Sequence, residues 1–327
     1  WKTLLIALEI AKNNSGCYMS STINEMLLRL SANSNGNKLN KMIAILQELV
    51  SLLELERLED NLFRGPSRDI GTNRVYGGQV LGQAIKAAQY TVEDNRNIHS
   101  LHAYFLREGD HDSPIIYEVD RSRDGNSFSA RRIVAIQHGR PIFTLSASFQ
   151  VEEEGLEYGI EMPDVPAPEK LISVREYETR HMDKLPEKFQ RLLSLSAPFD
   201  LKPVDFDEHL DSESASGGRH FWIKTVDELP AEPQLHRSIL AYVSDYGLLT
   251  SCLVPHGLHF LDSSLMMASI DHAMWFHRPF RMDEWLLYSC EAISTNNSRG
   301  LAKGNFFHQD GSLIASTNQE GLIRRKS

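Results

Sequence analysis

The sequence predicts an α+β protein in which one unit, an apolar helix followed by an antiparallel sheet, occurs twice. Three observations carry this prediction. An apolar helical stretch is followed by four strand-like runs that turn signals separate. The same order of elements returns in the second half of the chain. Apolar residues make up 41% and charged residues 24%, close to the averages of a globular protein with a packed core.

The first copy is expected over residues 42–151. Residues 1–41 are rich in turn-forming residues and form an unassigned N-terminal extension. From Met42, apolar residues spaced three and four apart predict a helix that ends near Gly65-Pro66. Gly77-Gly78 opens a second helix, predicted over residues 76–92. Strands are predicted over 98–106, 114–124, 127–139 and 141–151.

The second copy is expected over residues 218–327, after an acidic, proline-containing linker over 152–217. Its helix is predicted over 235–254, and its strands over 265–276, 284–294, 299–311 and 312–324. Matching motifs place Arg107 and Arg278 171 positions apart, and Gly139 and Gly311 172 positions apart. Offsets that agree within one residue over two strands indicate an internal duplication.

Composition excludes several classes of function. The net charge of −10, with no long basic run, argues against a general nucleic-acid or membrane-surface binder. The apolar run over residues 3–11 is too short to span a membrane, which takes roughly 20 residues. Three scattered cysteines indicate a reducing compartment, and the end "IRRKS" is not a peroxisomal signal. We therefore expect a cytoplasmic protein.

The stretch "SIDHAMWFHRPF" (269–280) is the most conspicuous polar cluster. On a strand, alternate side chains point to opposite faces, so Asp271 and His272 point apart, as do His272 and His277. No second His or Cys cluster supplies further zinc ligands, so no metal site is predicted. Both histidines are interpreted as structural, which leaves the Ser269 hydroxyl as the group of interest.

Two polar residues elsewhere could join Ser269. Asp245 lies on a mostly apolar helix face, where a buried carboxylate is expected to have a bonding partner or a catalytic role. A structural hydrogen bond to a loop amide is an equally good interpretation. Gln319 lies on the last strand, and the first copy has Ala147 in its place. Asp245, Ser269 and Gln319 together could hold one water and accept its proton.

Several motifs resemble the acyl-CoA thioesterase II family. They include "YGGQVLGQAIKAA", "YVSDYGLL", "PHGLHFLDSS", "SIDHAMWFHRPF" and "STNQEG", and the resemblance runs from about Met42 to about Arg325. It implies a double hotdog fold, two long helices each wrapped by a curved antiparallel sheet. It also implies hydrolysis of fatty acyl-CoA to free acid and coenzyme A, here of medium- to long-chain substrates, without metal or cofactor. The family's Asp, Thr or Ser, and Gln positions match Asp245, Ser269 and Gln319.

Further roles follow as expectations. Asp245 would be the base, and backbone amides at Gly77-Gly78 would stabilise the oxyanion, unless these glycines serve close packing alone. Met274, Trp275 and Phe276 could line an acyl channel or belong to the core. The coenzyme A phosphates would need local cations, for which Arg131, Arg132 and Arg299 are candidates against a solvated or interface role.

Two alternatives to a thioesterase remain open. A hotdog dehydratase acting on hydroxyacyl thioesters would use His272 or His277. A non-catalytic acyl-CoA-binding module would bind the ligand without releasing thiol. The family pattern also suggests a homo-oligomer, either a dimer or a tetramer.

Overall fold

The computed structural model describes residues 44–69, 74–181, 198–204, 218–258 and 262–326. The predicted extension over 1–41 lies outside the described residues. A helix over residues 44–53 opens the described chain. The α-helices that follow in the described chain are α3 (Gly77–Gln89), α4 (Val174–His181) and α7 (Pro233–Ser244), with 3-10 segments η1 (Pro168–Lys170) and η3 (Leu249–His256).

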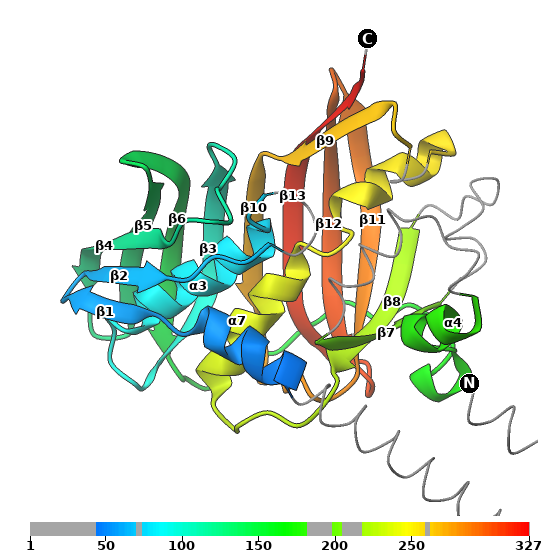
Figure 1. Ribbon diagram of the computed structural model, residues 1–327. Helices are drawn as coiled ribbons and strands as arrows, with labels where there is room; N and C mark the ends of the chain where they lie inside the picture. Colours follow the sequence, from blue (N-terminus) through cyan, green and yellow to red (C-terminus); the bar gives the residue numbers. More distant parts are fainter. Residues whose placement is uncertain (1–43, 70–73, 182–197, 205–217, 259–261, 327) are drawn as a thin grey trace, which may run out of the picture. The chain divides into compact units, whose positions relative to one another are not determined.

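Within the described residues, thirteen strands form one antiparallel sheet (Figure 1). They are β1 (Glu56–Glu59), β2 (Leu62–Gly65), β3 (Arg96–Phe105), β4 (Ile115–Asp124), β5 (Phe128–Gln137), β6 (Arg140–Val151), β7 (Phe199–Pro203), β8 (Gly218–Thr225), β9 (Leu265–Ser269), β10 (Asp271–Phe276), β11 (Leu286–Asn296), β12 (Arg299–His308) and β13 (Leu313–Arg325). Their order is β1-β2-β4-β5-β6-β3-β10-β13-β12-β11-β8-β7, with β9 paired to β13 beside this path. The two copies contribute six strands each to this path, in corresponding order from the outer edge inwards, and they meet where β3 pairs with β10.

The pairing at this junction confirms the internal duplication. His102 pairs with Ala273, its counterpart at an offset of 171, so a local two-fold axis passes through that pair. A side-chain bond is also repeated in the two copies. Arg107 Nη1 donates to the Pro141 carbonyl at 2.6 Å, and Arg278 Nη1 donates to the Leu313 carbonyl at 3.0 Å.

Helices α3 and α7 lie side by side against the sheet (Figure 1). Each has one predominantly apolar face, and their apolar residues belong to one continuous core. A Cβ on Gly82 of α3 would lie 3.0 Å from the Ser238 carbonyl of α7 and 2.7 Å from a Leu53 methyl. Glycine at this position therefore allows the two helices to approach closely.

Two predicted elements are wrong in part. The helix predicted from Met42 to about residue 65 ends at residue 53, and β1 and β2 follow as a hairpin. Asp60-Asn61 provides the turn, whereas leucine and glutamate spacing alone suggested a continuing helix. The predicted 152–217 linker contains β7, which pairs with β8 and forms the outer edge of the second half-sheet. The two helices, over 76–92 and the first part of 235–254, are confirmed, as are the eight predicted strands, one of which is interrupted at Ile270.

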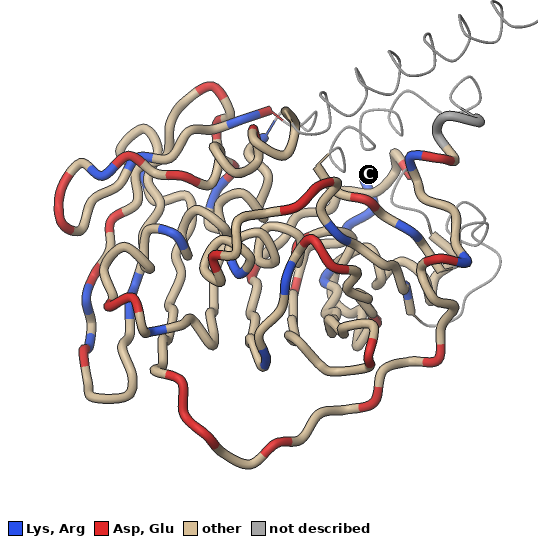
Figure 2. Tube along the Cα trace, turned by 90° about the horizontal axis from the view of Figure 1, so that it is seen from below, with Lys and Arg blue, Asp and Glu red and all other residues tan. Residues whose placement is uncertain are grey.

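Figure 2 shows Lys and Arg scattered among Asp and Glu along the trace, in keeping with the net charge of −10. Within the described residues, no helix combines the length and the apolar character that crossing a membrane requires.

Candidate active site

Asp245 lies where helix α7 ends. It is the C-cap residue, and the chain turns away through Gly247, whose φ of 67° is in the left-handed region. The helix predicted over 235–254 is therefore interrupted at Asp245 and resumes as η3. This interruption presents the carboxylate at the end of the helix instead of along its side.

The structure brings the three predicted side chains together. Gln319 Nε2 donates to Asp245 Oδ1 at 2.6 Å and to Ser269 Oγ at 2.9 Å. Ser269 Oγ lies 3.5 Å from Asp245 Oδ1, at the limit of a hydrogen bond. Ser269 is the last residue of β9, and Gln319 is fully buried on β13. Both hydrogens of the Gln319 amide are used, and its Oε1 has no partner among the described residues.

Burial dominates the electrostatics of Asp245. It raises the pKa of this carboxyl from 3.8 to about 6, although hydrogen bonds from Gln319, the Gly78 amide and Ser269 act in the opposite direction. A carboxylate with a pKa near 6 is ionised at neutral pH yet basic enough to accept a proton from a bound water. The raised pKa thus gives Asp245 a proton affinity that would suit a general base.

The first copy completes the site with the start of α3. The Gly78 amide bonds to the Asp245 carboxylate. A Cβ on Gly77 would lie 2.7 Å from Asp245 Oδ2, and one on Gly78 would lie 2.1 Å from the Tyr242 carbonyl. Tyr76 holds the start of α3 against α7, since its hydroxyl donates to the Tyr242 carbonyl at 2.9 Å. The two glycines are therefore required by close approach between the copies, whichever amide meets the substrate.

A cavity of about 300 Å³ adjoins the trio. Asp245, Ala268 and Ser269 form one wall, and the first copy provides the rest. The apolar part of that lining consists of Val75, Val80, Phe105, Leu106, Ile142 and Phe143. At the rim, Arg74 and Glu108 form an ion pair at 2.9 Å. The predicted channel residues Met274, Trp275 and Phe276 are not in this lining, and Met274 is fully buried in the core.

Comparison with known proteins identifies the family of this chain. The family profile described as acyl-CoA thioesterase matches residues 191–322, and the profile of the acyl-CoA thioesterase N-terminal domain matches residues 63–150. Acyl-CoA thioesterase 2 of Haemophilus influenzae is 41% identical over 283 residues, covering 86% of this chain and 99% of that protein. This chain belongs to the acyl-CoA thioesterase II family.

Other members and solved structures extend the likeness. Human acyl-coenzyme A thioesterase 8 is 37% identical over 290 residues, covering 85% of this chain and 89% of its own. The crystal structure of acyl-CoA thioesterase II TesB2 from Mycobacterium marinum is 38% identical, with a TM-score of 0.71, and covers 85% of this chain and 99% of that one. The fold is a double hotdog, and the family is one of thioester hydrolases.

The first copy lacks counterparts of Ser269 and Gln319. At an offset of 171, Ile98 stands where the second copy has Ser269, and Ala147 stands opposite Gln319 at an offset of 172. Both are buried apolar residues of the core. The first copy therefore contributes the start of α3 and the cavity wall, and the second copy contributes the polar groups.

The polar residues of β10, and His277 directly after it, have structural partners. His272 is buried, and its Nε2 lies 2.9 Å from Ser244 Oγ, the residue before Asp245. Burial lowers the pKa of His272 to about 3, so its ring is neutral. His277 Nε2 lies 3.0 Å from Ser316 Oγ, and Asp271 accepts from the Glu320 amide at 2.6 Å. None of these three residues lines the cavity beside Asp245.

The three candidate arginines lie in different surroundings. Arg131 is 2% exposed, and its guanidinium bonds to Thr91, Asp124 and the Arg123 carbonyl, so it has no free face for a phosphate. It is a structural residue because the end of α3 and the β4–β5 turn converge on it. Arg132 is exposed on β5, four strands from β13. Arg299 is 43% exposed and pairs with Glu320 at 2.8 Å.

One group of potential metal ligands occurs among the described residues: Asp110, His111 and Asp112. The Asp110 carboxylate already accepts from the Asp112 amide, the Ser113 hydroxyl and His138. These bonds account for the cluster as a polar turn between β3 and β4.

Proposed function

We propose that this protein hydrolyses medium- to long-chain fatty acyl-CoA to the free fatty acid and coenzyme A. The observation that carries the proposal is the bond pattern of Gln319. Its amide holds Asp245 and Ser269 together at the wall of an apolar cavity, and the Asp245 pKa of about 6 suits a general base.

In this mechanism a water molecule attacks the thioester carbonyl carbon while Asp245 accepts its proton. Ser269 and the free Oε1 of Gln319 orient the water. The tetrahedral intermediate then collapses, the C–S bond breaks, and protonated Asp245 returns the proton to the departing thiolate. The net reaction consumes one water and produces a carboxylic acid and a thiol.

The developing oxyanion needs donors that are already in place. We assign this role to the Gly77 amide at the start of α3, where the helix dipole favours negative charge. Gly77 lines the cavity, and no described residue accepts from its N–H. The Gly78 amide bonds to Asp245, so it acts on the base in the resting enzyme.

The acyl chain would occupy the apolar cavity of the first copy, against Val80, Phe105 and Phe143. Of the predicted arginines, we retain Arg299 for the coenzyme A phosphates. Arg131 lacks a free face, and Arg132 stands four strands from Gln319, about 19 Å at the usual strand spacing. Self-association and a cytoplasmic location remain predictions.

A thiol-release assay over acyl-CoAs of graded chain length tests the proposal. We expect stoichiometric release of coenzyme A and free acid, with the highest kcat/KM for medium or long chains. Formation of an enoyl thioester from a hydroxyacyl-CoA would instead support the dehydratase. Acyl-CoA binding in calorimetry with no thiol release would support a non-catalytic binding module.

A further inference from the structure

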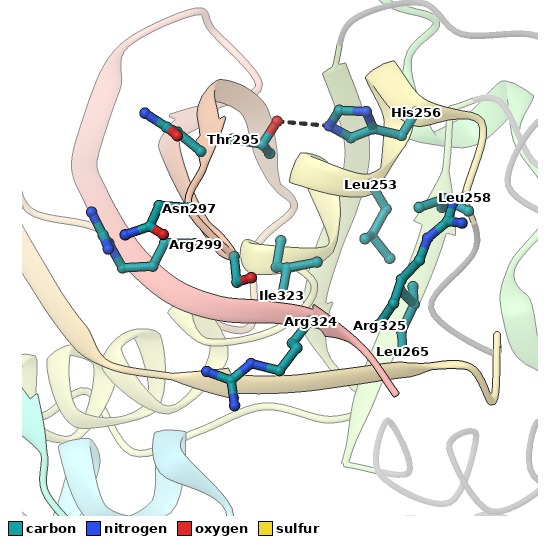
Figure 3. A pocket seen from close by; sticks show the side chains of 12 residues that line it. Leu253, His256, Leu258, Leu265, Thr295, Asn297, Arg299, Ile323, Arg324 and Arg325 are labelled. Carbon is teal, nitrogen blue, oxygen red and sulfur yellow. Dashed lines mark hydrogen bonds between the residues drawn. The ribbon is translucent and has the colours of Figure 1, made fainter. Parts of the chain in front are cut away.

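A second cavity lies at the far end of the β9–β13 ribbon. Its volume is about 600 Å³, within the range of small-molecule sites. Figure 3 shows its wall, formed by the end of η3, the start of β9, the end of β13 and the β11–β12 turn. We call it the arginine pocket, after Arg299, Arg324 and Arg325 in its lining.

The charge of the arginine pocket is unusual for this chain. Its twelve lining residues include three arginines and His256 but no Asp or Glu, in a chain whose net charge is −10. Arg324 and Arg325 are exposed, and neither has an ion pair within the described part of the chain. Arg299 is paired with Glu320, so Arg324 and Arg325, which extend from opposite faces of β13, are the unpaired arginines of the lining. Two unpaired guanidinium groups at one pocket favour a ligand with several negative charges.

The rest of the lining gives the pocket an apolar floor. Leu253 and Ile323 lie between Arg299 and Arg325 in Figure 3, and Leu258 and Leu265 lie beside Arg325. Thr295 bonds to His256 at 2.7 Å at the opposite rim. Apolar walls with a few charged groups suit a ligand that joins a flat ring to phosphates, because the ring can pack on the leucines.

Strand β9 connects this pocket to the active site. Leu265 lines the arginine pocket, whereas Ala268 and Ser269 line the catalytic cavity. Four residues of an extended strand span about 13 Å. A substrate that bridges the two cavities therefore needs a long, extended arm between its reacting carbonyl and its charged end.

The outer edge of β9 offers a path for such an arm. Within the described residues β9 pairs with β13 alone. Ile270 N–H donates to the Glu320 carbonyl, and Lys326 N–H donates to the Ser264 carbonyl. In an antiparallel pair every second residue bonds to the partner strand, so these two bonds show which residues of β9 face β13 and which face away. By that alternation, the N–H and C=O of Met267 face the free edge, where amide groups of an extended ligand can bond to them.

We propose that the arginine pocket binds the phosphate-bearing nucleotide end of coenzyme A, with the pantetheine arm running along the free edge of β9. The inference rests on the proposed function and adds a binding site to it. Arginine suits phosphate because its planar guanidinium donates two parallel hydrogen bonds. The nucleotide phosphates lie at Arg299, Arg324 and Arg325, and the adenine ring packs on the apolar floor.

The experiment compares two thioesters with the same acyl chain, acyl-CoA and acyl-pantetheine, which lacks the nucleotide. In the double variant R324A/R325A, we expect KM for acyl-CoA to rise at least tenfold with kcat unchanged, since charged hydrogen bonds are lost. KM for acyl-pantetheine should not change. The matched control is R121A, an exposed arginine on β4 that bonds to Asn61, for which both KM values should stay at the wild-type level.

Calorimetry with adenosine 3′,5′-bisphosphate separates this inference from the proposed function. Binding by the wild type that R324A/R325A abolishes supports the site, even if acyl-CoA is not hydrolysed. Hydrolysis of acyl-CoA with wild-type KM in R324A/R325A overturns the inference and leaves the proposed function intact. An equal rise in KM for both thioesters would also overturn it.

Discussion

The side-chain nitrogen of Gln319 lies 2.6 Å from Asp245 Oδ1 and 2.9 Å from Ser269 Oγ. Because a carboxylate only accepts hydrogen bonds, this contact fixes which end of the amide faces Asp245. A residue on the last strand thereby positions the Asp245 carboxylate at the end of α7 and the Ser269 hydroxyl at the end of β9. The catalytic proposal depends on this arrangement.

The pH dependence of the reaction should report the Asp245 pKa. Burial raises this pKa to about 6, and only the ionised carboxylate can accept a proton. We therefore expect kcat/KM to be constant at neutral pH and to fall tenfold per pH unit below about 6. A kinetic pKa near the ordinary value of 3.8 would contradict the assignment. The Q319E variant is a second test. A second carboxylate beside Asp245 should raise the Asp245 pKa, so the fall in kcat/KM should begin at a higher pH.

Ser269 should act through its hydroxyl alone. S269A removes one of the groups that orient the water, so we expect kcat to fall about 10²-fold with little change in KM. S269T retains a hydroxyl and should keep most of the activity. In S269A/Q319A the losses should be less than additive, because both residues position the same water. Additive losses would mean that the two residues act separately.

Gly78 should be intolerant of a side chain. A Cβ there would lie 2.1 Å from the Tyr242 carbonyl, so G78A must displace the start of α3 from α7. We expect a loss of about 1–3 kcal/mol in the free energy of unfolding, together with a lower kcat because the Gly78 amide bonds to Asp245. The control is G155A, since nothing lies within 4 Å of a Cβ on Gly155. Denaturant midpoints for the two variants measure the difference, and equal stability would contradict the predicted clash.

His272 should affect stability and not the chemistry. Its pKa falls from 6.5 to about 3 on burial, so the unfolded chain binds a proton that the folded chain excludes. Its contribution to stability is present above pH 6.5 and is lost as pH falls towards 3. H272Q removes this titration, so its stability should vary less steeply than that of the wild type between pH 7 and 5. In H272Q the rate of thiol release should still fall as pH drops below about 6, as in the wild type. A dehydratase that uses His272 as its catalytic residue would instead lose its activity in this variant.

The sequence predicts the trio and the duplication because each rests on short local motifs, and the duplication follows from comparing such motifs between the two halves of the chain. Strand alternation set Asp271 and His272 aside and left Ser269, and the offset of 171 is repeated in the His102–Ala273 pairing. The sequence placed the Gly77-Gly78 amides at the site of Asp245, but it could not predict that the Gly78 amide bonds to the carboxylate itself, because that contact joins two helices from different copies. The bonds that bury Arg131 could not be predicted for a related reason, since its partner Thr91 lies 40 positions away. The β1–β2 hairpin was missed because its leucine spacing also fits a helix.

The most direct test of the catalytic proposal is the D245N variant in a thiol-release assay with a saturating acyl-CoA. Asparagine has nearly the same shape but cannot accept the proton. We predict that kcat falls by about 10²- to 10⁴-fold while KM stays close to that of the wild type. A fall of less than tenfold, with KM unchanged, would contradict the assignment of Asp245 as the general base.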